Sequence, residues 1–145
     1  MKIVLYGATG KAGSRILTEL LNRGHEVVAV TRHPEKLASR SGLTVHKGDL
    51  SDTAAIAETI GGATAVISAY GPPPDKPGQL VAVTKRQIAA VQQVSHQASS
   101  PEHAPRLIVV GGAGSLEVSP GKALVSTPGF PAAWILAMAS SWPDR

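Results

Sequence analysis

Gly7-Ala8-Thr9-Gly10-Lys11-Ala12-Gly13 is the stretch that decides the fold of this 145-residue chain. It follows the apolar and β-branched run Lys2–Tyr6, which is typical of a short buried strand. It opens Lys11–Arg23, where apolar residues recur at the spacing of one helical face. A strand, a glycine-rich turn and a helix in this order favour a backbone that receives phosphate groups.

The three glycines of this turn have separate physical reasons. Gly7 allows the tight turn, Gly10 lets a diphosphate approach the backbone without meeting a Cβ, and Gly13 lets the helix pack closely on the sheet. Free N–H groups and the positive end of the helix dipole then face the phosphates. The expected cofactor-binding residues here are Gly7, Thr9, Gly10, Lys11, Ala12 and Gly13. A purely structural turn is the alternative.

The rest of the chain repeats the alternation of strand and helix. It ends in an irregular stretch from residue 111 that includes a possible short apolar helix, Ala132–Ser140. Fully apolar strands joined by helical crossovers indicate a parallel sheet covered on both faces. We therefore expect one α/β domain over 1–145, a Rossmann-type doubly wound sheet of about five strands in the order 3-2-1-4-5. The expected strands are Lys2–Tyr6, Glu26–Val30, Thr44–His46, Ala63–Ser68 and Arg106–Val110; the expected helices are Lys11–Arg23, Asp52–Ile60 and Gln79–Ala98.

Composition excludes several classes of function. There is no cysteine, so disulfides and thiol catalysis are absent, and the five histidines show no metal-ligand spacing. The formal charge of +4 is spread singly or in pairs, without the basic blocks or interleaved aromatics of a nucleic-acid binder. No apolar run reaches the ~20 residues of a membrane span. We expect a cytoplasmic protein without nucleic-acid, membrane or metal partners.

Several stretches together resemble a known family. These are the glycine turn, Lys47-Gly48-Asp49-Leu50, Ala65–Ala69 and Val109–Ser115. Over roughly Met1–Pro131 the chain is similar to the atypical short-chain dehydrogenase/reductases. It is closest to their NAD(P)H-binding group of biliverdin reductase B-like flavin reductases and NmrA-like proteins. Members of that group usually continue with two further strands and helices that supply much of the substrate pocket, whereas the tail Trp134–Arg145 of this chain matches the family poorly.

The resemblance implies further site residues. Asp49, with Leu50, lies where the family contacts the adenine amine, although a turn residue is the alternative reading of that acid. Ser68, Ala69 and Tyr70 end the fourth strand, at the crevice where the ribose and nicotinamide should pass. Ser115 lies near the position of a serine close to the nicotinamide, which makes it the catalytic candidate; an ordinary loop serine is the alternative.

The end of the second strand predicts the type of nicotinamide cofactor. An NAD site normally places an acid there for the ribose 2′-hydroxyl, but this chain has Val30-Thr31-Arg32-His33. A guanidinium binds a 2′-phosphate and stacks on adenine, so Arg32 favours NADP(H). An exposed loop arginine is the alternative.

The acid–base pair of the classical short-chain dehydrogenases is missing. Neither Tyr6 nor Tyr70 has a lysine four residues on. Hydride transfer to a flavin or quinone depends mostly on positioning and needs no strong acid. We expect an NADPH-dependent oxidoreductase acting on a flavin, a quinone or a similar small acceptor. The alternative is a non-catalytic redox sensor, with a sugar-nucleotide epimerase less favoured.

An exposed edge at the fifth strand also predicts self-association.

Overall fold

The computed structural model describes residues 1–73, 75–76, 78–112, 114 and 116–130. The chain divides into two compact units. The first consists of Met1–Gly71 and Val83–Val110, and the second of Pro72–Ala82 and Gly111–Arg145. The first unit holds the sheet and nearly all of the expected site residues. The expectation of one domain over 1–145 stays a prediction.

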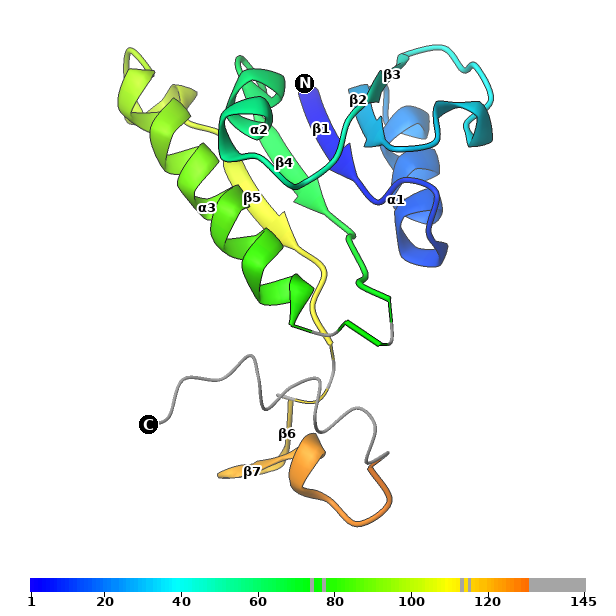
Figure 1. The fold of residues 1–145 in the computed structure, drawn as a ribbon, viewed down its shortest axis with the longest axis vertical. Coiled ribbons are helices and arrows are strands. Elements are labelled where there is room, and N and C mark those ends of the chain that lie inside the picture. Colours follow the sequence, from blue (N-terminus) through cyan, green and yellow to red (C-terminus); the bar gives the residue numbers. More distant parts are fainter. Residues whose placement is uncertain (74, 77, 113, 115, 131–145) are drawn as a thin grey trace. The chain divides into compact units, whose positions relative to one another are not determined.

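A five-stranded parallel sheet forms the centre of the first unit, in the order β3-β2-β1-β4-β5 (Figure 1). This order confirms the Rossmann-type fold expected from the sequence. Strand β1 lies in the middle because its run of β-branched and apolar residues suits a position buried on both faces. The strands are β1 (Lys2–Tyr6), β2 (Glu26–Thr31), β3 (Leu43–Lys47), β4 (Ala65–Ser68) and β5 (Arg106–Val109).

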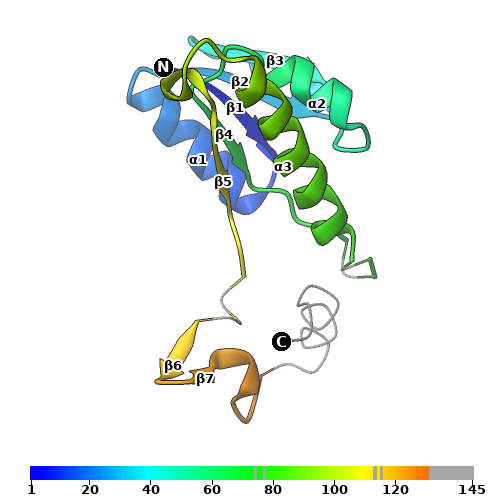
Figure 2. The same cartoon turned by 90° about the vertical axis from the view of Figure 1, so that its left-hand side faces the viewer.

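Helices cover both faces of this sheet. Figure 2 looks along it from the β5 edge, with α1 on one side and α2 and α3 on the other. The helices are α1 (Lys11–Asn22), α2 (Thr53–Ile60) and α3 (Gln79–Gln97), with short 3-10 turns η1 (Pro34–Lys36) and η2 (Pro101–His103). The five expected strands and the three expected helices between residues 2 and 110 are present, with bounds that differ by one or two residues at most.

The core has two layers because successive strand residues point to opposite faces. On the α1 side, Ile3 and Leu5 of β1 pack with Leu17 of α1. On the other side, Val4 and Tyr6 pack with buried residues of α2 and α3. Ile3–Tyr6 of β1 are therefore all buried. Their burial on both faces fixes the position of the strand's carboxyl end and of the glycine turn that follows it.

The described part of the second unit contains a small antiparallel hairpin. It consists of β6 (Glu117–Ser119) and β7 (Lys122–Ala123), with Gly121 at a positive φ of 75° in the turn. A 3-10 turn, η4 (Leu124–Ser126), follows directly. This hairpin lies in the stretch for which the sequence predicts no regular element, and the expected helix Ala132–Ser140 lies outside the described residues.

Within the described residues, no helix is long and apolar enough to cross a membrane. The same residues contain no group of three or more His, Asp or Glu side chains that could hold a metal ion.

Candidate cofactor site

The glycine turn between β1 and α1 is closed by backbone contacts that leave no room for side chains. Gly7 has a φ of 80°, and a Cβ there would lie 2.4 Å from the carbonyl oxygen of Ala69. A Cβ on Gly13 would lie 2.0 Å from the carbonyl oxygen of Gly7. Because only glycine allows these approaches, the first turn of α1 sits directly against the end of β1 and beside the end of β4.

The amino terminus of α1 has no side chain that satisfies its first amides. Its N-cap is Gly10, no acidic residue lies in its first turn, and no described residue accepts a hydrogen bond from the N–H groups of Lys11, Ala12 and Gly13. Thr9, Lys11 and Ala12 are exposed there. Three free amides at the positive end of a helix attract an anion.

Helix α2 provides the contrast within the same molecule. Its N-cap is Asp52, whose carboxylate accepts hydrogen bonds from the N–H groups of Ala54 at 3.2 Å and Ala55 at 3.1 Å. A carboxylate fills the anion position at α2, whereas the equivalent position at α1 is open to a ligand.

The loop after β2 presents Arg32 at the same edge of the sheet. Arg32 is exposed, and no described carboxylate lies within ion-pair distance of its guanidinium. The hydroxyl oxygen of Thr31 accepts a hydrogen bond from the His33 N–H at 3.0 Å, which tightens the turn. The next acid along the chain, Glu35, contacts His33 Nδ1 at 3.2 Å. The arginine is thus free to bind an added anion.

The loop after β3 holds Asp49 in a defined orientation. Its Oδ1 accepts hydrogen bonds from the N–H of Ser51, at 2.8 Å, and from the Ser51 hydroxyl. These two bonds, with the nearby guanidinium groups of Arg32 and Arg86, lower the pKa of the Asp49 carboxyl below its ordinary value. The other oxygen, Oδ2, has no hydrogen-bond donor among the described residues. An ionised carboxylate with one free oxygen can accept a bond from an amine.

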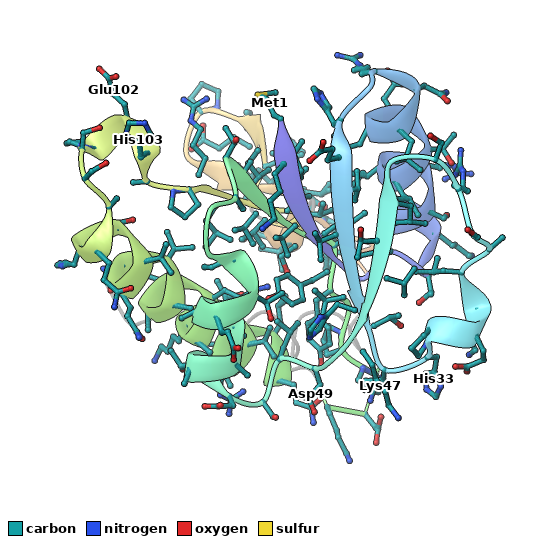
Figure 3. All side chains as sticks on the ribbon, turned by 90° about the horizontal axis from the view of Figure 1, so that it is seen from above. Met1, His33, Lys47, Asp49, Glu102 and His103 are labelled. Carbon is teal, nitrogen blue, oxygen red and sulfur yellow. The ribbon has the colours of Figure 1, made fainter. Side chains whose placement is uncertain are left out.

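These loops meet at one edge because the sheet is parallel. In Figure 3, Asp49 and Lys47 lie with His33 along one edge, opposite Met1, Glu102 and His103. The same edge carries the glycine turn and the end of β4, where Ser68 is buried and Ala69 and Tyr70 are half-buried. The structure therefore brings together the expected site residues that it describes. Ser115, the expected catalytic residue, lies outside the described residues.

Tyr6 takes no part in proton transfer at this edge. Its phenol is buried in the core, and burial raises its pKa well above the ordinary value of 10.0. The hydroxyl has no hydrogen-bond partner among the described residues. A phenol in this position keeps its proton at neutral pH, which agrees with the missing lysine partner in the sequence.

Sequence reasoning missed Arg86, which reaches this site from α3. Its Nη1 donates a hydrogen bond to the carbonyl oxygen of Leu50 at 3.3 Å. The sequence gives no local signal for the contact, because the two residues lie 36 positions apart and meet only when α3 packs on the sheet.

A comparison with family models identifies the family of this chain. A model described as NAD(P)H-binding matches residues 7–140, from the first glycine of the turn to beyond the sheet. The chain belongs to this NAD(P)H-binding family. The unfilled amides of α1 and the glycine approaches at Gly7 and Gly13 fit the diphosphate of a nicotinamide cofactor.

This chain spans about three-fifths of the length of several proteins that it resembles. The uncharacterized protein YwnB of Bacillus subtilis is 38% identical over 133 residues, which are 90% of this chain and 57% of that protein. A structure described as a candidate epimerase of Bacteroides thetaiotaomicron is 40% identical with a TM-score of 0.76, covering 97% of this chain and 61% of that one. A structure described as a candidate NADH-flavin reductase of Streptococcus pneumoniae is 33% identical with a TM-score of 0.71. The match covers 97% of this chain and 62% of that one.

The first prediction concerns the contact between α1 and the turn. We expect Gly13→Ala to lower the free energy of unfolding by about 1–3 kcal/mol or more, because its Cβ would overlap the Gly7 carbonyl. Urea denaturation measures the change. Gly78→Ala is the control, since nothing lies within 4 Å of a Cβ there. Equal stability of the two variants would contradict the close approach.

Proposed function

We propose that this chain is an NADPH-dependent oxidoreductase that passes a hydride to a flavin, a quinone or a similar small acceptor. The observation that carries the proposal is the set of free amides at Lys11, Ala12 and Gly13, next to a turn that only glycine can form. A bound NADPH would supply the hydride, and the acceptor would take one proton from water to complete its reduction. The residues of this chain bind and orient the cofactor.

Three parts of the edge are assigned to three parts of the cofactor. The glycine turn takes the diphosphate, with Thr9 and Lys11 beside it. Asp49 Oδ2 accepts a hydrogen bond from the adenine amine, and Leu50 lies next to the ring. Ser68, Ala69 and Tyr70 line the path of the ribose and nicotinamide, and Ser115 is the candidate next to the nicotinamide. The resemblance to the reductase group supports these roles.

Arg32 supports NADPH over NADH. The end of β2 carries an exposed guanidinium where an NAD site carries an acid. Glu35 is the nearest acid in sequence, and its contact with His33 holds it in that pair. The Streptococcus structure is described as a candidate NADH-flavin reductase, and Arg32 is the feature of this chain that favours NADPH instead.

We expect the chain to bind NADPH about ten- to a hundredfold more tightly than NADH, the range for a hydrogen bond to a charged group. Arg32→Asp should reverse this preference, because a carboxylate repels the 2′-phosphate and accepts from the 2′-hydroxyl. Fluorescence titration measures both constants. Lys36→Asp is the control, an exposed lysine of η1 with the same change of charge. If the wild-type chain and Arg32→Asp each bound NADPH and NADH with equal affinity, this assignment would be refuted.

Turnover separates the oxidoreductase from the runner-up, a non-catalytic redox sensor. We expect NADPH consumption, followed at 340 nm, in the presence of FMN or a quinone, because hydride transfer to these acceptors needs positioning rather than an ionised tyrosine. Tight NADPH binding without consumption by any acceptor would favour the sensor. The candidate epimerase among the relatives adds little weight to epimerisation, since neither tyrosine is followed by a lysine four residues on.

Self-association through β5 is a further part of the proposal. Among the residues that the structure describes, β4 is the one neighbour of this strand in the sheet, and Ile108 is 50% exposed. Two copies of such an edge can pair antiparallel about a two-fold axis. We expect sedimentation equilibrium to show a dimer that Ile108→Lys dissociates, whereas Val118→Lys, on exposed β6, leaves it intact. A monomer at every concentration would refute the idea.

A cytoplasmic location without nucleic-acid or membrane partners stays a prediction.

A further inference from the structure

Arg86 fastens the loop after β3 to helix α3. Its guanidinium is part-buried and donates to the Leu50 carbonyl oxygen at 3.3 Å. The side chain of Leu50 is itself buried in the core layer that contains Tyr6 and Ile56. The backbone at Leu50 is therefore fixed from both sides, by a side chain in the core and by a hydrogen bond on its carbonyl. Asp49 is the residue directly before this fixed point.

The same guanidinium acts on Asp49 through space. Hydrogen bonds from Ser51 are the largest cause of the lowered pKa of the Asp49 carboxyl, and the charges of Arg32 and Arg86 add to them. The proposed 2′-phosphate would neutralise Arg32. Of the two guanidinium groups, Arg86 would then be the one whose charge still acts on Asp49 when the cofactor is bound.

We propose that Arg86 is a positioning residue that makes this site selective for adenine over purines without a 6-amino group. The inference rests on the proposed cofactor site and adds a residue to it. Arg86 fixes the loop so that Oδ2 of Asp49 faces the base, where the ionised carboxylate accepts a hydrogen bond. A 6-amino group donates to such an oxygen, whereas the 6-oxo group of hypoxanthine has no hydrogen to donate and places a partially negative oxygen against the carboxylate.

The test compares NADPH with its hypoxanthine analogue by fluorescence titration. We expect the wild-type chain to bind NADPH about ten- to a hundredfold more tightly than the analogue, the range for a hydrogen bond to a charged acceptor. Arg86→Met should bring the two dissociation constants close to each other. Arg86→Gln keeps a donor for the Leu50 carbonyl but no charge, and it should retain part of the ratio. Lys85→Met is the control, an exposed neighbour on α3 with the same loss of charge.

The ratio of the two dissociation constants is the informative readout. A merely structural defect in α3 would weaken the binding of both ligands equally and leave this ratio unchanged. A wild-type ratio in both Arg86→Met and Arg86→Gln would overturn the role of Arg86 while leaving the cofactor site in place. Equal binding of the two ligands by the wild-type chain would also overturn it. Failure of the wild-type chain to bind NADPH at all would remove the proposed cofactor site, and the role of Arg86 with it.

Discussion

The close approach of helix α1 to the end of β1 is the constraint on which the rest of this structure depends. Gly13 faces the Gly7 carbonyl at a distance that excludes any Cβ, and Gly7 itself lies against Ala69. The helix therefore starts at the turn, with Gly10 as a cap that has no side chain. Its first amides are left without an internal acceptor and point to the carboxyl edge of the sheet.

The sheet supplies the rest of the site through its topology. With β1 in the centre, the ends of β2 and β3 lie on one side of the glycine turn and the end of β4 on the other. Arg32 and Asp49 follow neighbouring strands, so their opposite charges come near each other without forming a direct ion pair in the described residues. This edge of the sheet therefore carries a guanidinium and a carboxylate. A ligand that has phosphate groups and also an amino group on an aromatic ring suits it better than a simple anion does.

Local features of the sequence predicted most of this arrangement. The strand, turn and helix that begin at Lys2–Tyr6 and the missing acid near Arg32 depend on residues close together in the chain. Long-range contacts were not predictable in this way. The bond from Arg86 to Leu50 requires α3 to be placed on the sheet, and burial of the Tyr6 phenol depends on three elements at once. The hairpin β6–β7 has short strands with weak alternation, which gave no signal.

The most direct test of the central claim is an amide-resolved NMR titration of the 14.9 kDa chain with NADPH. The account predicts the largest shifts at Lys11, Ala12 and Gly13, whose amides have no acceptor in the described structure, and small shifts at Ala54 and Ala55, whose amides are already bonded to Asp52. Saturable binding that leaves the three α1 amides unmoved would contradict it.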